Sequence, residues 1–260
     1  MDLALFGTQK FILFLLVLVR TAGIFMLTPI FGSRQMPMQC RSALAVAFTM
    51  VFVPVVAVNG DLPTDMLPLL IMIIREASVG LAIGFVCSLV FSTIQIAGEF
   101  IDFQSGLAFA SMVDPASGNR SGIMGRFQNT FALLLFLATN AHHYVIRGLS
   151  ESFAIAPIGH AGINAAVAGS ITELFSSLFS VAVRISLPIV GAVIIADVAM
   201  AIMARVVPQI QVFFVGMPIK LGLALFAMLT AIPVIAVMSQ GLFGDMYHQM
   251  GIAVRQMAMF

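Results

Sequence analysis

Charged side chains inside long apolar segments are the residues of this chain best suited to chemistry. They are Arg20, Arg75, Glu76, Arg184, Asp197 and Lys220. A charge at the centre of a bilayer costs about 2.5–3.5 kcal/mol on insertion scales, so each of these must face a partner, a polar cavity or water. They could form a path for protons or ions, or they could form ion pairs that fix the alignment of helices. Because no row of carboxylates follows one helix face, the pattern favours ion pairing.

Arg75 and Glu76 are neighbours in the sequence and therefore point to different sides of a helix. They cannot face each other as a pair. We expect each of them to have its own partner.

The motifs of enzymes and metal sites are missing. His142 and His143 are adjacent, so they cannot bind one metal from a single helix face as residues at i and i+4 do. Neither HExxH, GxSxG nor a phosphate-binding GxxxxGK[ST] occurs. Cys40 and Cys87 are far apart and form no CxxC, which favours buried apolar roles. We expect a protein without catalytic residues, cofactor or metal.

The composition is that of an integral membrane protein. Hydrophobic residues make up 61% of the 260 residues, charged residues only 9%, and the mean hydropathy is +1.10. A globular domain is about 45–50% apolar and about 25% charged, so this chain has too little polar surface to cover a water-soluble particle. The net charge of +1 and the lack of a basic cluster give no indication of a nucleic-acid partner.

Six apolar segments predict an all-α membrane protein. They cover residues 11–31, 41–58, 67–97, 127–146, 174–204 and 210–239. A membrane span needs about 20 residues, and three of the segments approach thirty. A helix of that length reaches roughly 45 Å, whereas the hydrocarbon core is about 30 Å thick. Pro188, Pro218 and Pro233 lie in two of these segments, so we expect long, kinked helices and helical hairpins.

Small residues recur every four positions along the segment 67–97. The ladder consists of Glu76, Gly80, Gly84, Ser88 and Ser92. Gly80 and Gly84 form a GxxxG pair, and such pairs allow two helix backbones to approach closely. The ladder predicts a long packing contact with another helix.

The longest polar interruption is the stretch Gly98–Arg126, which contains five glycines. Its centre, Gly106–Met112, is small and apolar, which is unusual for a solvated connection. We therefore consider two interpretations. The stretch is either an ordinary loop at the membrane surface, or a loop that lies in or across a passage lined by the surrounding helices.

A set of short motifs, in order along nearly the whole chain, resembles the FliR/SctT family of export-gate subunits in bacterial type III secretion systems. The motifs are Arg20-x-x-Gly23, Pro29-x-Phe31-Gly32, Gly98-Glu99-x-x-Asp102-x-Gln104-x-Gly106-Leu107, Asp114-Pro115, Asn140-x-His142, Arg184-x-x-x-Pro188, Arg205-x-x-Pro208-Gln209 and Pro218-x-Lys220. Each motif is weak by itself, and the ordered set is more specific. The motif that begins at Gly98 and the motif that begins at Arg205 are the most telling.

This resemblance implies an assembly. One such subunit would join several FliP-type subunits and several FliQ-type subunits, and a FlhB-type subunit, around a channel for unfolded export substrates. Residues 1–173, with the loop 98–126, would be similar to the FliP type. Residues 174–260 would form a FliQ-like hairpin, at about 174–239, and a C-terminal tail. The complex would lie in the bacterial inner membrane at the flagellar basal body, with a part projecting toward the periplasm.

The resemblance also implies that the central loop, here about 104–119, closes the channel. Leu107, Phe109 and Met112 would be the sealing side chains. Gly106 and Gly118 would be hinges, because glycine tolerates backbone angles that other residues do not. Asp114 and Pro115 would form a rigid turn.

Three other functions fit parts of the sequence. A secondary transporter would also have broken helices and buried charges, but it predicts internal repeats, and none is apparent. A scaffold that only completes the ring would need the loop for assembly and not for closure. An injectisome subunit of the same family would have the same motifs as a flagellar one.

Overall fold

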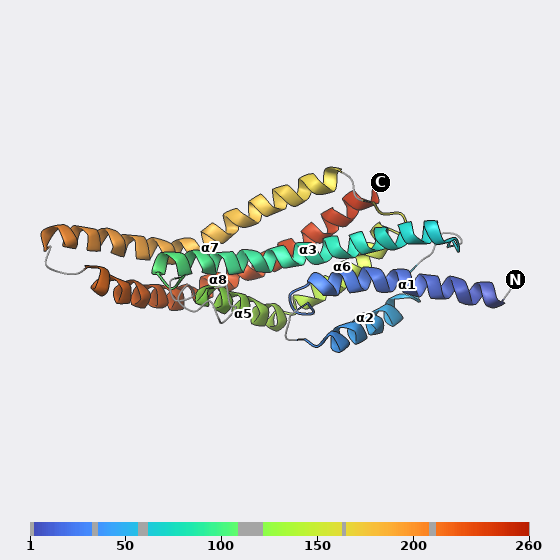
Figure 1. The fold of residues 1–260 in the computed structure, drawn as a ribbon, viewed down its shortest axis with the longest axis horizontal. Helices are drawn as coiled ribbons and strands as arrows, with labels where there is room; N and C mark the ends of the chain where they lie inside the picture. Colours follow the sequence, from blue (N-terminus) through green and yellow to red (C-terminus); the bar gives the residue numbers. More distant parts are fainter. Residues whose placement is uncertain are drawn as a thin grey trace. The chain divides into compact units, whose positions relative to one another are not determined.

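All regular secondary structure in the described parts of the chain is helical. The computed structural model describes residues 3–32, 36–56, 62–108, 122–162, 165–207 and 212–259. Every regular element in these ranges is an α-helix, which confirms the predicted all-α class (Figure 1). The helices are α1 (Leu3–Leu27), α2 (Met38–Phe52), α3 (Met66–Ser105), α5 (Ile123–Ala138), α6 (His142–Ile155), α7 (Ala165–Val206) and α8 (Val212–Ala258).

Four of these helices are long and apolar enough to cross a membrane, namely Gly7–Leu27 of α1, all of α3, Gly169–Val206 of α7 and Phe214–Ala258 of α8. The prediction of six spans is therefore wrong for two segments. The segment 41–58 corresponds to α2, which has only 15 residues. The segment 127–146 is divided between α5, with 16 residues, and α6.

The division of the segment 127–146 occurs at Asn140, whose φ is 57°. This left-handed conformation is uncommon outside glycine, and asparagine tolerates it better than most residues. It ends the helical path directly after the α5 C-cap, where the Thr139 N–H donates to the Leu135 carbonyl over 2.8 Å. Hydropathy does not detect such a break, because the break depends on one backbone angle and not on how apolar the neighbouring residues are.

Three helices are longer than a bilayer requires. α3 has 40 residues, α7 has 42 and α8 has 47, which correspond to lengths of about 60–70 Å. The hydrocarbon core is only about 30 Å thick. α7 continues through Pro188, and α8 continues through Pro218 and Pro233. The prediction of long helices is therefore confirmed.

The first of two compact units consists of Met1–Leu89, Asn140–Leu174 and Phe243–Phe260. Its core includes the fully buried side chains of Leu16, Ile24 and Ile83. An aromatic cluster joins α1 to α2, since the Phe25 and Phe48 rings lie 5.2 Å apart, edge to face. The unit thus has an ordinary hydrophobic core built from distant parts of the sequence.

The second compact unit consists of Val90–Thr139 and Phe175–Leu242. In it, α5 packs on the last turns of α3, with the Phe91 and Phe136 rings 5.3 Å apart. α7 and α8 run side by side as a hairpin (Figure 1). This division follows spatial contacts and groups residues differently from the split near residue 173. That split concerns likeness to other subunits and stays a prediction.

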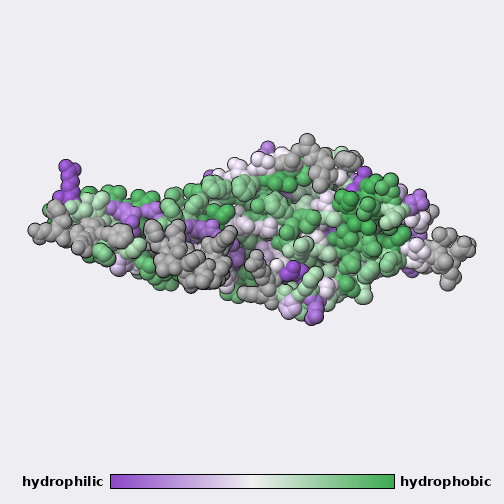
Figure 2. Space-filling view, viewed as in Figure 1, coloured by the Kyte–Doolittle hydropathy of each residue, from purple (hydrophilic) through white to green (hydrophobic). Residues whose placement is uncertain are grey.

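Large hydrophobic side chains remain exposed on the chain, and Figure 2 shows broad hydrophobic areas on the face in view. In the most apolar stretch of α3, 61% of the residues are buried within the chain, compared with 28% for α7 and 22% for α8. Lipid or other subunits must cover the remaining apolar surface, because water would not.

Candidate functional site

A fully buried ion pair lies in the first unit. The Nε of Arg20 on α1 donates to the Oε2 of Glu76 on α3 over 2.6 Å, and both side chains are 0% exposed. Isolated buried charges are costly unless they are paired and fully hydrogen-bonded. Arg20 and Glu76 therefore have the charged partner that each needs inside an apolar segment.

The remaining donors of Arg20 bind the end of α6. Its Nη1 donates to the carbonyl oxygen of Ser152 over 3.0 Å, and its Nη2 donates to that of Ala156 over 3.0 Å. Its guanidinium also lies 4.5 Å from the centre of the Phe153 ring. The planar guanidinium of Arg20, with its several N–H donors, thus links α1, α3 and α6 at one point. The single ammonium group of a lysine could not bind all of these acceptors together.

Arg75 and Glu76 bind the two sides of one residue, Gly159. The Nη1 of Arg75 donates to the Gly159 carbonyl over 2.8 Å, while the Gly159 N–H donates to the Oε1 of Glu76 over 2.9 Å. Gly159 has a φ of 79°, a conformation that glycine adopts without strain. Arg75 and Glu76 therefore do not pair with each other, as predicted, but both bind Gly159, so the expectation that they have wholly separate partners is wrong.

Gly80 and Gly84, in the first half of the small-residue ladder, lie against α1. A methyl group on Gly80 would lie 2.3 Å from the carbonyl oxygen of Arg20, and one on Gly84 would lie 2.9 Å from that of Ile24. This close packing of α3 on α1 places Glu76 directly beside Arg20. Further along, Ser88 donates to the Phe85 carbonyl of its own helix, and Ser92 is exposed.

The second unit contains the two helix ends that border the predicted closing loop, about residues 104–119, which is called the central segment below. Asp102, in the last turn of α3, is 2% exposed. Its Oδ1 accepts from the N–H of Met124 over 3.0 Å, and its Oδ2 accepts from the N–H of Gly125 over 3.0 Å. The first N–H groups of a helix have no partner within that helix. Asp102 therefore caps α5 from a different helix and holds its negative charge at the positive end of the α5 dipole.

Glycines make this contact possible. A methyl group on Gly122 would lie 2.0 Å from the Oδ2 of Asp102, and one on Gly98 would lie 2.6 Å from the Cα of Gly125. α3 and α5 therefore touch backbone to backbone. The polar stretch predicted as a loop over 98–126 is helical at both ends, up to Ser105 and from Ile123, and residues 109–121 lie outside the described residues.

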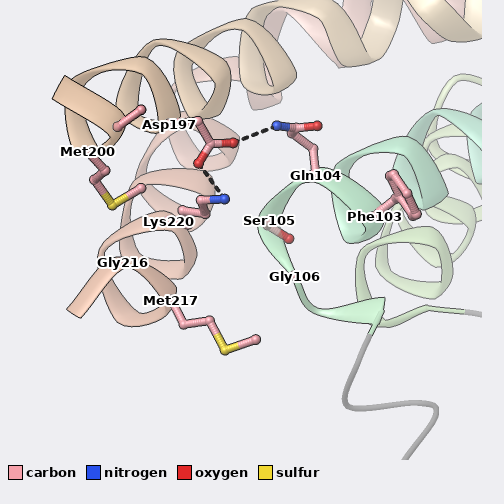
Figure 3. Close-up of a pocket in the computed structure, with 10 residues that line it drawn as sticks. Phe103, Gln104, Ser105, Gly106, Asp197, Met200, Gly216, Met217 and Lys220 are labelled. Carbon is pink, nitrogen blue, oxygen red and sulfur yellow. Dashed lines mark hydrogen bonds and ion pairs between the residues drawn. The ribbon is translucent and has the colours of Figure 1, made fainter. Parts of the chain in front are cut away.

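A second polar contact lies beside the end of α3. Gln104 donates from Nε2 to the Oδ2 of Asp197 on α7 over 2.9 Å, and Asp197 also forms an ion pair through Oδ1 with Lys220 on α8 (Figure 3). The Asp197 and Lys220 side chains are about 30% exposed. These charges therefore form a pair within the chain, and they connect the hairpin to the helix that leads into the central segment.

An open pocket of about 400 Å³ lies beside this ion pair. Figure 3 shows Gln104, Asp197 and Lys220 converging on one side of it, while Met217 extends along another. Its remaining lining is mainly small or apolar: Phe103, Ser105, Gly106, Met200, Ala201 and Gly216. The pocket lies at the end of α3, beside Ser105 and Gly106.

Two of the seven residues predicted for channel closure belong to the described structure. Gly106 has a φ of 85°, in the region that favours glycine, and Leu107 follows it in the same turn, half-buried. Phe109, Met112, Asp114, Pro115 and Gly118 lie outside the described residues.

Of the predicted buried charges, Arg20 is fully buried, Arg75, Asp197 and Lys220 are half-buried, and Arg184 is exposed.

Sequence reasoning assigned no role to several residues that organise these sites. Ser152, Gly159, Gln104 and Asp102 all bind groups that are distant in the sequence. Asp102 did carry a signal, because a carboxylate near the end of an apolar helix needs a partner. Within the residues whose structure is described, no group of three His, Cys, Asp or Glu side chains could hold a metal ion.

Comparison with known proteins identifies the family of this chain. Residues 11–246 match the family model for bacterial export proteins, family 1. The chain is 34% identical to the flagellar biosynthetic protein FliR of Bacillus subtilis over 88% of this chain and 90% of that protein. It is 29% identical to FliR of Escherichia coli over 89% and 88%, and 27% identical to FliR of Aquifex aeolicus over 92% and 93%. The chain therefore belongs to the FliR family of bacterial export proteins.

Proposed function

We propose that this chain is a non-enzymatic subunit of the flagellar protein export gate in the bacterial inner membrane. Its membership of the FliR family over residues 11–246 carries the proposal. In this role it joins FliP-type, FliQ-type and FlhB-type subunits and lines the passage for unfolded export substrates. The flagellar names of its relatives favour this role over an injectisome subunit or a secondary transporter.

The segment 104–119 closes the passage at rest. In support of this role, Asp102 joins the last turn of α3 to the first turn of α5, so the chain leaves and re-enters the helices at one place. The apolar residues Leu107, Phe109 and Met112 of the segment can form a hydrophobic constriction, and such constrictions close channels by excluding water.

The test replaces residues 107–118 by a glycine–serine linker of equal length. We expect the assembled complex to conduct small ions, because the linker keeps the chain length and removes the sealing side chains. Loss of membrane potential in cells, and ion flux into vesicles that contain the purified complex, measure this leak.

The same variant expressed without the FliP-type subunit is the control, and it must not leak, because closure concerns the assembled channel. If the variant assembles with its partners and membrane permeability stays at the parental level, the closing role of the segment is excluded. If the variant fails to assemble, the scaffold alternative gains support.

A further inference from the structure

We infer that Arg184 on α7 is the docking point for a carboxylate on an apolar helix of a neighbouring subunit. Arg184 lies within the candidate span Gly169–Val206, and its side chain is exposed. The inference rests on the proposed assembly with other export subunits, because it needs a second chain. It adds the position of one contact on α7 and the charge that the partner must carry there.

The first support is that the guanidinium of Arg184 has no partner in the part of the chain that the structure describes. No described residue forms a hydrogen bond or an ion pair with it. Charged side chains inside apolar, membrane-spanning segments are costly, and they almost always pair with one another or with backbone carbonyl groups. An anionic group must therefore approach Arg184 from elsewhere.

The second support is that the acidic side chains around it already bind other groups. Arg184 belongs to the second compact unit. The acidic residues of that unit, within the described residues, are Glu99, Asp102 and Asp197. Glu99 binds a side chain of its own helix, Asp102 binds the start of α5, and Asp197 pairs with α8. None of them supplies the charge that Arg184 needs.

The third support is the shape of the α7 face that carries Arg184. Ser180 lies one turn before it and Gly191 two turns after it on the same face. A methyl group added to Gly191 would meet nothing within 4 Å in the chain, although glycine is less favourable than alanine inside a helix. Small residues allow a second helix to approach closely. The face thus combines space for another helix with an unpaired positive charge.

The position of Arg184 along α7 favours a protein carboxylate over a lipid phosphate. It lies about 22 Å and 33 Å from the two ends of the candidate span, and arginines reach the lipid headgroups from positions near helix ends. Large apolar side chains are exposed on both sides of it, with Phe179 at 49% and Leu187 at 59%. Arg184 therefore lies at the level of apolar surroundings, where a carboxylate on a second helix can meet it.

The test measures assembly of the chain with FliP-type and FliQ-type subunits in detergent. Arg184→Met removes the charge, keeps most of the side-chain length and leaves the partner carboxylate unpaired. We expect association weakened about thirtyfold or more, as for the loss of one side of a buried charge pair. Arg184→Lys keeps the charge, so its loss should be smaller. The unfolding midpoint of the isolated chain should stay at the parental value in both variants.

The matched control is Arg255→Met. Arg255 is also exposed, but it lies in the last turn of α8, where water or headgroups can solvate the charge and where it is favourable toward the helix dipole. We expect this variant to assemble as the parent does.

Charge reversal identifies the partner. Arg184→Glu is combined in turn with a lysine at each acidic position in the apolar helices of the FliP-type and FliQ-type subunits. We expect one combination to restore the complex, because the exchanged charges attract each other again. Asp114→Lys in this chain is included, since Asp114 lies outside the described residues.

Several results would overturn the inference. They are parental assembly of Arg184→Met, a lower unfolding midpoint of the isolated Arg184→Met chain, rescue through Asp114→Lys alone, and failure of every combination. In the last case, a photoreactive residue at Leu187 that forms adducts only with lipid would identify a lipid phosphate as the partner. If the parental chain itself does not assemble with the other subunits, the proposed function fails as well, and this result is distinct because it does not depend on any change at Arg184.

Discussion

At the residue scale, the buried charges form pairs and capping contacts within the chain. Arg20 and Glu76 bind each other, and Asp197 binds Lys220. Asp102 binds backbone N–H groups. Because these charges have partners on other helices, they define how the helices align. This agrees with the structural role that the sequence favoured over a path for protons or ions.

The Arg20 pair gives a test of this role. Arg20→Met leaves the Glu76 carboxylate buried without its charged partner, and breaking a buried pair in this way costs about 3–5 kcal/mol. We therefore expect a large fall in the thermal unfolding midpoint of the purified protein. Arg20→Lys keeps the charge but cannot reach Ser152 and Ala156 together, so we expect an intermediate loss.

Arg184→Met is the matched control, because Arg184 is an arginine of an apolar helix that is exposed in the chain. Its expected cost is within about 0.5 kcal/mol, as for most surface substitutions. Equal unfolding midpoints for Arg20→Met and Arg184→Met would contradict a stabilising role for the buried pair.

At the element scale, close helix packing depends on glycines whose neighbours are backbone atoms. Gly80 on α3 lies against Arg20 on α1, and Gly98 on α3 lies against Gly125 on α5. One long helix thus uses close glycine contacts in both compact units. Backbone atoms cannot rotate away from an added side chain, so a larger residue at these positions would push the helices apart.

Gly80→Ala tests this packing. The new methyl group would lie 2.3 Å from a carbonyl oxygen, and overpacking of this kind typically costs about 1–3 kcal/mol. We expect a lower unfolding midpoint and weaker cross-linking between cysteines placed on α1 and α3.

The control is Gly222→Ala on α8, where nothing lies within 4 Å of the added methyl group. Alanine favours a helix over glycine by roughly 0.8–1.0 kcal/mol, so this variant should be as stable as the parent or more stable. A Gly80→Ala variant that matches Gly222→Ala would show that α1 and α3 are not in close contact.

The elements also show which features are readable from the sequence. Apolar length predicted the long helices, and GxxxG predicted a close helix contact at Gly80. Hydropathy missed the break at Asn140, because that break depends on one backbone angle. It also missed the helical state of Gly98, since the contact with Gly125 comes from another helix.

The sequence predicted the candidate sites only in part, because their contacts also come from other helices. The sequence identified Arg20, Glu76, Asp197 and Lys220 as charges that need partners. It could not pair Arg20 with Glu76, which is 56 residues away, because the pairing depends on which helices are neighbours in space. The hydrogen bonds of Asp102 to α5 were hidden for the same reason.

At the scale of the whole molecule, the chain leaves much of its apolar surface uncovered. On α8, Phe226 and Leu229 are 65% and 67% exposed, whereas Ile235 on the same helix is 1% exposed. Helices of about 60–70 Å extend well beyond a hydrocarbon core of about 30 Å. Lipid tails cannot cover all of such a helix, so we expect neighbouring export subunits to cover part of it.

Site-specific photo-cross-linking distinguishes subunits from lipid. A photoreactive residue at Leu229 should form adducts with other proteins of the export apparatus in intact cells, because this exposed position then faces a subunit. The same residue at Ile235 should form none, because that side chain packs inside the chain. Gel shifts and mass spectrometry of the adducts identify the partners.

If Leu229 forms adducts only with lipid, this part of α8 faces the bilayer, and other subunits do not cover it. In that case the exposed face of α8 would be an ordinary membrane-spanning surface, and the gate would have to assemble through other parts of the chain.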